Sequence, residues 1–285
     1  MREADQRPIC ATPVARENIL AVIEYPEGTP SWVDLSSSDL DASARFYGEL
    51  FGWQAAESEG SPKESGGYRM FTLGGVEVAG LGPAQPGQPS AWNTYMAVAD
   101  VDAARDKVEA AGGTTVMGPL QVMDAGTMAI FTDAAGGAFF AVWQADRHRG
   151  AQLVNEPGAL TLNELGTRDL DAAARFYGEV FGWQFEPLEI DGAVQYGFFR
   201  LGGRMVASLL PMGEQFPPEV PPHWVPYFGI DDLDAGVATA QQLGAHLLMG
   251  PSPVPEGRFA ALRDPQGAVF SMWEGSYDPP PGSGA

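Results

Sequence analysis

Two acidic residues, Asp34 and Glu164, stand at equivalent places in two similar stretches of the chain, at an offset of 164 − 34 = 130 residues. Each lies in a short segment that predicts a β-strand, in which alternate side chains share one face. A carboxylate turned inward beside aromatic rings has a raised pKa and can act as a general acid or base. Asp34 and Glu164 are therefore the candidate catalytic residues, for a proton transfer that needs no metal.

Tyrosines and other aromatic residues accompany these carboxylates. Tyr95 and Tyr227 lie in a later predicted strand of each half. Aromatic rings with one carboxyl and one phenol suit a flat polycyclic ligand, because rings stack while polar groups fix a hydroxyl or an amine. The alternative is that the aromatic residues are core and the acids bond to backbone. The predicted ligand-binding residues are Trp32, Asp34, Trp92, Asn93, Tyr95, Phe140, Glu164, Trp224, Tyr227 and Phe270.

All of these residues lie in a duplicated sequence. The pattern DLDAxARFYGExFGW occupies residues 39–53 and again 169–183, and both halves close on a tryptophan, Trp143 and Trp273, again 130 apart (273 − 143). A constant offset over half a chain indicates two copies of one unit, each long enough to bury its own core. The predicted divisions are an N-terminal arm over 1–28, a first domain over 29–146, a linker over 147–157, a second domain over 158–275 and a flexible tail over 276–285.

Each copy is predicted to contain two strand–helix–three-strand units. In the first, a strand over 31–37 precedes Asp39, an expected N-cap, and a helix over 40–50 ends at Gly52. Short alternating runs with glycine breaks follow, and the same order then repeats. The expected fold class is α+β.

Four βαβββ modules with the DLDxxxxFYxxxFGW segments resemble the vicinal oxygen chelate superfamily, which includes glyoxalase I, bleomycin-resistance proteins and extradiol dioxygenases. The strand-end turns DPQGAVFSMW at 264–273 and DAAGGAFFAVW at 133–143 carry the same resemblance. It covers about residues 29–275 and is greatest to two-domain actinobacterial members of aromatic polyketide clusters labelled hydroxylases. It implies two tandem glyoxalase-like domains, each a pair of modules forming a curved sheet with a cleft. It does not choose among lyase, isomerase, dioxygenase and binding protein.

The resemblance also implies positions for the ligands of a divalent metal. Tryptophan, leucine, valine and phenylalanine cannot coordinate a metal, and asparagine and serine are weak ligands alone. The aligned positions are Trp32 and Leu162, Asn93 and Val225, and Phe140 (or Ala141) and Ser271.

The histidines agree with this result. The chain has three, of which His148 lies in the linker, His246 follows a helix and His223 lies two residues from Val225. Three or four converging ligands are needed for a catalytic site. We therefore predict no metal and no other cofactor.

Charge and composition limit the partners. A formal net charge of −21 argues against nucleic acid, which needs clustered lysine and arginine. The acid excess is explained either by solubility or by attraction of a cationic ligand such as an amino-sugar compound. No apolar run approaches the roughly 18 residues of a membrane span, and the N-terminus lacks the apolar stretch of a signal peptide. We expect a cytoplasmic protein with no membrane partner, whose single cysteine, Cys10, forms no internal disulfide.

The leading hypothesis is a metal-free binding protein for a small aromatic, polyketide-type natural product, acting in antibiotic self-resistance, sequestration or biosynthesis. The alternative is a tailoring enzyme of the superfamily, a hydroxylase, lyase or isomerase, that uses an inward carboxylate or an unrecognised metal site. A signalling scaffold is a third. The duplication is expected to replace the homodimer of single-domain relatives, which leaves a monomer or a further homodimer.

Overall fold

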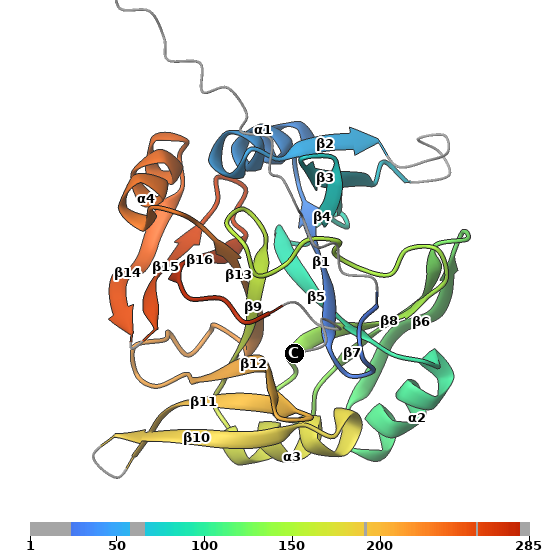
Figure 1. Ribbon diagram of the computed structural model, residues 1–285. Helices are drawn as coiled ribbons and strands as arrows, with labels where there is room; N and C mark the ends of the chain where they lie inside the picture. Colours follow the sequence, from blue (N-terminus) through green and yellow to red (C-terminus); the bar gives the residue numbers. More distant parts are fainter. Residues whose placement is uncertain (1–23, 58–65, 191–192, 255, 280–285) are drawn as a thin grey trace, which may run out of the picture.

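The computed structural model describes residues 24–57, 66–190, 193–254 and 256–279, which form two eight-stranded mixed sheets (Figure 1). Most of the predicted arm, with Cys10, and the end of the predicted tail lie outside these residues. The strand order in the first sheet is β2-β3-β4-β1-β5-β8-β7-β6. Its elements are β1 (Pro30–Ser37), α1 (Leu40–Phe51), β2 (Gln54–Glu57), β3 (Arg69–Leu73), β4 (Val76–Pro83), β5 (Ala91–Ala97), α2 (Val101–Ala110), β6 (Thr114–Val122), β7 (Gly126–Thr132) and β8 (Phe139–Ala145).

The second sheet repeats the first, with the order β10-β11-β12-β9-β13-β16-β15-β14. Each half therefore contains two βαβββ modules, as predicted. Its elements are β9 (Leu160–Thr167), α3 (Leu170–Phe181), β10 (Gln184–Ile190), β11 (Ala193–Leu201), β12 (Arg204–Pro211), β13 (His223–Gly229), α4 (Leu233–Gln242), β14 (His246–Val254), β15 (Gly257–Arg263) and β16 (Val269–Gly275).

Local sequence explains the limits of the first helix in each half. The Asp39 side chain accepts a 2.9 Å hydrogen bond from the Ala42 amide, which satisfies a free N–H at the helix start. Gly52 follows the last turn with φ of 75°, in the left-handed region that favours glycine. Asp169 and Gly182 repeat both features at α3. None of the described helices is long and apolar enough to cross a membrane.

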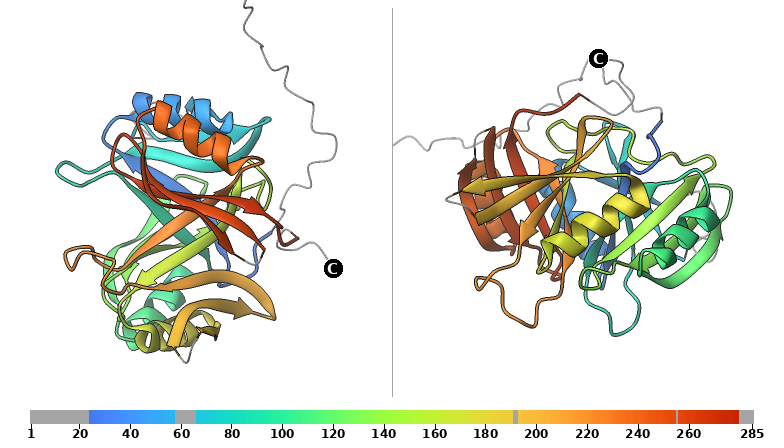
Figure 2. Two further views of the ribbon diagram at one scale, coloured as in Figure 1. Left: turned by 90° about the vertical axis from the view of Figure 1, so that its left-hand side faces the viewer. Right: turned by 90° about the horizontal axis from the view of Figure 1, so that it is seen from below.

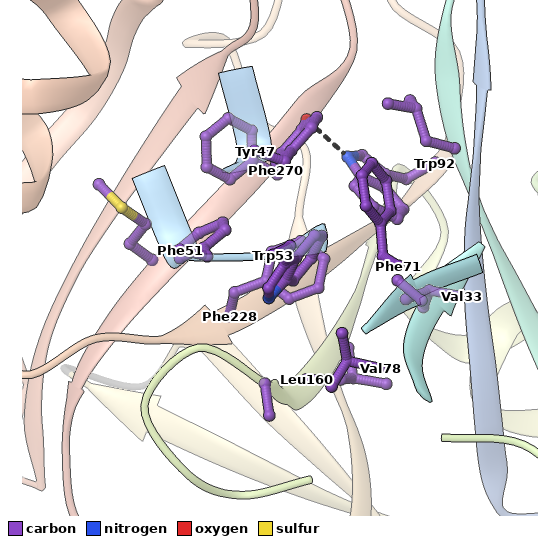
Figure 3. Packing of buried hydrophobic residues seen from close by; sticks show 14 of the residues in the cluster. Val33, Tyr47, Phe51, Trp53, Phe71, Val78, Trp92, Leu160, Phe228 and Phe270 are labelled. Atoms are coloured by element: carbon purple, nitrogen blue, oxygen red, sulfur yellow. Dashed lines mark hydrogen bonds between the residues drawn. The ribbon is translucent and has the colours of Figure 1, made fainter. Parts of the chain in front are cut away.

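The hydrophobic core is shared between the halves. One buried cluster joins Phe51 and Trp53 of the first half to Phe228 and Phe270 of the second (Figure 3). A second cluster joins side chains of β5, α2, β7 and β8 to side chains of β9, α3, β11 and β12. The expectation that each half buries its own core is therefore wrong, because each cluster needs both halves.

The helices also pair between the halves. Helix α1 contacts α4 and helix α2 contacts α3, and the two pairs lie at opposite ends of the molecule (Figure 2, left). Between them, β5 of the first sheet contacts β13 of the second, and Thr94 donates a buried 2.9 Å hydrogen bond to Asn163. One face of each sheet is thus covered by helices and by the other half.

The tryptophan of each FGW motif crosses between the halves. Trp53 Nε1 donates to the Gly158 carbonyl at 2.7 Å, and Trp183 Nε1 donates to the Gly28 carbonyl at 2.8 Å. Each glycine lies just before the first strand of the other half. Both indoles are buried.

Candidate functional site

The two carboxylates lie on the face of each sheet that points away from the helices, which we call the open face. In the first sheet Val33 and Leu35 turn to the helix side and enter the shared core. Strand alternation then places Trp32 and Asp34 on the open face. In the β1–β5 register Trp32 is opposite Tyr95, and Asp34 is opposite Asn93.

Asp34 accepts hydrogen bonds on both carboxyl oxygens, although it is only 8% exposed. Tyr95 Oη donates to Oδ2 at 2.8 Å, and Asn93 Nδ2 donates to Oδ1 at 2.8 Å. Tyr68 Oη donates to Oδ2 at a longer 3.3 Å and itself accepts from Trp32 Nε1 at 3.1 Å. Four predicted site residues are therefore joined in one network.

Glu164 has a closely similar environment in the second sheet and is 6% exposed. Tyr227 Oη donates to Oε1 at 2.9 Å, and Tyr196 Oη donates to Oε2 at 2.5 Å. Ser208 Oγ donates to the same oxygen at 3.3 Å. Each half thus holds one buried carboxyl between two phenols.

The environment of these carboxyls makes them weaker acids than usual. Burial raises the pKa of Asp34 and of Glu164, and the hydrogen bonds from their neighbours offset only part of that rise. No described lysine or arginine forms an ion pair with either carboxyl at 4 Å or less. Burial and the adjacent carboxylate also raise the pKa values of Tyr95 and Tyr227 well above the ordinary value. The phenols therefore remain donors, while the carboxyls can exchange a proton.

Four of the predicted ligand-binding residues lie on the opposite side of the sheets. Trp92 Nε1 donates to Tyr47 Oη at 3.0 Å inside the first core cluster (Figure 3). Trp224 Nε1 donates to Tyr177 Oη at 3.1 Å in the second cluster. Each tryptophan is one residue away from an open-face position, and one step along a strand reverses the side chain. The structure likewise buries Phe140 and Phe270 in the core and does not bring them to the carboxyls.

The positions implied for metal ligands form a poor donor set. In the strand register Tyr95 is opposite Ala141 and Tyr227 is opposite Ser271, which selects Ala141 over Phe140 as the aligned residue. His223 bonds the Pro221 carbonyl at 2.8 Å. The described residues contain no group of three or more histidine, cysteine or acidic side chains placed to hold a metal. Side chains without lone pairs at most of these positions do not fit a divalent cation.

Sequence reasoning missed Tyr68 and Tyr196. They are separated by 196 − 68 = 128 residues and precede matching runs, YRMFTL and YGFFRL, which was the available signal. Tyr68 immediately precedes β3 and Tyr196 lies in β11, and in each sheet one strand, β4 or β12, separates these strands from the strand of the carboxyl. Alternation along one strand gives the face of a side chain but not which strands are neighbours in the sheet.

His148 was assigned to the linker, yet its ring lies against the open face. The ring is edge-on to Trp32 with centroids 4.4 Å apart, and Nδ1 lies 3.1 Å from Glu77 Oε2. Its Nε2 atom is buried and has no hydrogen-bond partner among the described residues. The Ala151 amide also donates to the Ser31 carbonyl at 2.8 Å, so the linker packs along the start of β1.

The rest of the first open face is apolar. Register places Met128 opposite Trp143 and Ile130 opposite Ala141, and Met117 and Leu120 of β6 continue the same face. Met117 is 40% exposed and Leu120 47%. Flexible methionine side chains next to exposed apolar surface are well suited to contact an apolar ligand.

Comparison with known proteins agrees with this architecture. The family model of the Glyoxalase/Bleomycin resistance protein/Dioxygenase superfamily matches residues 29–139 and 159–272. The Mn(II)-bound glyoxalase from Novosphingobium aromaticivorans has the same fold, with a TM-score of 0.61 at 18% identity over 88% of this chain and 83% of that one. The dioxygenase LapB from Pseudomonas sp. KL28 has a TM-score of 0.62 at 14% identity, over 91% of this chain and 96% of that one.

Proteins found by sequence comparison have a higher sequence identity to this chain than these solved structures do. The protein named "Putative glyoxylase CFP32" from Mycobacterium tuberculosis is 44% identical over 254 residues, covering 87% of this chain and 95% of the relative. The anthracycline biosynthesis protein DnrV from Streptomyces peucetius is 37% identical over 265 residues, covering 88% and 94%. With two family matches and relatives of this identity along most of its length, the chain belongs to the Glyoxalase/Bleomycin resistance protein/Dioxygenase superfamily.

Proposed function

We propose that this chain binds a flat aromatic, polyketide-type natural product on an open face, without a metal, in the biosynthesis or sequestration of an antibiotic or in self-resistance to it. The observation that carries the proposal is the Asp34–Tyr95 hydrogen bond of 2.8 Å, set in a sheet face that also presents aromatic rings and exposed apolar side chains. An apolar site with a few oriented polar groups is the usual form of a small-molecule site. Similarity to DnrV and to DauV, both named as anthracycline biosynthesis proteins, supports this ligand class.

The acidic surface supports a cationic substituent on the ligand. A net charge of −21 attracts cations at long range, and this attraction weakens with salt. An anthracycline with an amino sugar would then bind faster than its aglycone at low ionic strength. The difference would shrink as salt is added.

A second candidate is a metal-free proton-transfer enzyme. The observation that favours it is the raised pKa of Asp34 and Glu164, each bonded to phenols that stay protonated. A carboxyl with such a pKa can take a proton from an acidic position of a polyketide quinone and return it elsewhere. The same open face would bind the substrate.

Titration of the purified chain with an anthracyclinone, followed by tryptophan fluorescence, tests the binding proposal. We expect saturable quenching that is weakened at least about tenfold, or about 1.4 kcal/mol, in the Asp34→Asn, Glu164→Gln double variant. Asp102→Asn, which removes a charge from an exposed side chain of α2, should bind like wild type. Chromatography of the ligand after incubation separates the two candidates, since only an enzyme converts it and the double variant would abolish that conversion. Absence of wild-type quenching would refute the proposal.

A further inference from the structure

The surroundings of the two carboxyls differ at four equivalent positions. By strand register, Gly80 beside Asp34 corresponds to Ser208 beside Glu164. Ala141 opposite Tyr95 likewise corresponds to Ser271 opposite Tyr227. The two remaining pairs are Asn93 with Val225 and Ser36 with Gly166.

The second carboxyl cluster satisfies its own hydrogen bonds. Ser208 Oγ donates to Glu164 Oε2 at 3.3 Å, beside the bonds that Tyr196 and Tyr227 donate to the same carboxyl. Both oxygens of Glu164 and both phenols therefore have partners within the protein. A buried network that is complete in itself stabilises the fold and presents little to a ligand.

The surface beside Glu164 is also apolar and crowded. Val225 occupies the place of Asn93, so no amide is present. A side chain on Gly166 would begin 3.3 Å from Met212 Sδ and 3.5 Å from His223 Cε1. The second sheet therefore has no amide at this position, and the side chains of Met212 and His223 leave little free space there.

The first cluster, in contrast, turns polar groups outward. Asn93 Nδ2 donates to Asp34 Oδ1 at 2.8 Å and to Ser36 Oγ at 3.0 Å. This fixes the orientation of the amide, because an amide oxygen would be repelled by the carboxylate. The amide oxygen of Asn93 and the hydroxyl hydrogen of Ser36 then have no partner among the described residues, and both side chains are half-buried. One acceptor and one donor remain side by side.

Tyr68 supplies a flat wall next to this pair. Its ring lies over Gly80 and Gly82, and a side chain on Gly80 would begin 1.8 Å from Tyr68 Oη. The hydrogen bond that Trp32 Nε1 donates to the Tyr68 hydroxyl holds the ring in place. Aromatic ligands stack on such a surface.

We propose that the first sheet alone binds the ligand and that Asn93 and Ser36 recognise a hydroxyl group beside a ring carbonyl on it. The ligand hydroxyl donates to Asn93 Oδ1, and the ligand carbonyl accepts from Ser36 Oγ. Asp34 acts as a positioning residue that orients the amide, and the Glu164 cluster has a structural role. This inference rests on the function proposed above and assigns that function to one sheet and one kind of ligand edge.

Titration with two anthraquinones tests the assignment. Quinizarin carries hydroxyls beside its carbonyls, whereas unsubstituted anthraquinone lacks them. We expect one quinizarin per chain and binding of anthraquinone weaker by at least about tenfold, the typical effect of a lost hydrogen-bonded pair. Asn93→Val, which copies the second half, should reduce quinizarin affinity to the level of anthraquinone. Val225→Ala, the matched change in the other sheet, should stay within about twofold of wild type.

A milder variant guards against misfolding of Asn93→Val, which removes a partner of a buried carboxyl. Ser36→Ala leaves the Asn93–Asp34 bond intact and should weaken quinizarin while leaving anthraquinone unchanged. Two quinizarin molecules per chain, or wild-type quinizarin affinity in Ser36→Ala, would overturn the inference but not the proposed function. Wild-type protein that binds neither anthraquinones nor an anthracyclinone would overturn both.

Discussion

The hydroxyl of Tyr47 donates a 2.9 Å hydrogen bond to Oδ2 of Asp264, a residue of the other half of the chain. The equivalent pair in the repeat is Tyr177 and Asp133, whose hydrogen bond is 3.0 Å long. Each aspartate also accepts bonds from backbone amides of its own strand-end turn. The helix motif of each half is thereby fixed to the turn of the other half, and the same contact supports the indole of Trp92 or Trp224 from behind the sheet.

Removing the Tyr47 hydroxyl should destabilise the whole chain. Tyr47→Phe keeps the ring but leaves the Trp92 N–H and one oxygen of Asp264 without a partner in the core, at a cost of about 1–3 kcal/mol. Tyr177→Phe should cost a similar amount. Urea denaturation measures both, with Tyr277→Phe as a control in a partly exposed tyrosine whose bond is 3.4 Å long, expected below about 0.5 kcal/mol. Equal effects in all three variants would mean that the cross-half bonds add nothing.

The buried open-face carboxyls should make stability decrease with rising pH. The pKa of Asp34 is raised above its usual 3.8, so the folded state binds this proton more tightly than the unfolded state does. Stability from this group is therefore fully present at low pH and is lost as the pH rises from the usual value through the raised one. The free energy of unfolding of Asp34→Asn and of wild type should be measured in urea from about pH 4 to pH 8. The difference, variant minus wild type, should increase as the pH rises. Parallel curves for the two proteins would contradict the burial of an ionisable Asp34.

The Tyr68 ring leaves no room for a side chain at position 80, so we expect substitution of Gly80 to destabilise the protein. A side chain there would begin 1.8 Å from Tyr68 Oη, so Gly80→Ser should cost about 1–3 kcal/mol by overpacking. In a Tyr68→Ala background the same change should cost less, because the contacts with the ring are absent and only the 2.8 Å contact with Asp34 Cβ remains. A double-mutant cycle of unfolding free energies gives the coupling directly. If the destabilisations by Gly80→Ser and Tyr68→Ala simply add in the double variant, the Tyr68 ring does not restrict the side chain at position 80.

His148 should shield Trp32 from solvent. The imidazole lies edge-on at 4.4 Å, and Trp32 is buried. His148→Ala should expose the indole and shift the tryptophan emission to longer wavelength. The same substitution in a Trp32→Phe background should leave the spectrum unchanged, and a shift that persists there would come from another tryptophan such as Trp143.

The carboxyl–phenol pairs could be predicted from sequence because the ligand positions implied by the family resemblance give the inward face of each strand, and strand alternation then places the acids and the tyrosines on that face. Asp34 with Tyr95 and Glu164 with Tyr227 were both found in this way and are hydrogen-bonded. Trp92 and Trp224 flank the same strands, but their side chains lie on the opposite face. The long-range partners Tyr68 and Tyr196 depend on the order of the strands in each sheet, which no local pattern records.

The shared core could not be predicted for a different reason. Two copies of one sequence have the same hydrophobic pattern whether each closes on itself or on its neighbour. The choice is made by individual contacts, such as Phe51 against Phe228 and Trp53 against Phe228, with ring centroids 5.4 Å and 5.1 Å apart. Only the three-dimensional arrangement contains this information.

The reciprocal bonds of Trp53 and Trp183 have a consequence for synthesis of the chain. When the first half leaves the ribosome, the Gly158 acceptor of Trp53 and the aromatic partners Phe228 and Phe270 have not yet been made. Phe46, Phe51 and Trp53 therefore stay uncovered until most of the second half has been translated, and a nascent chain in this state is exposed to aggregation and to chaperones. Nearly the full length must emerge before either half can complete its core.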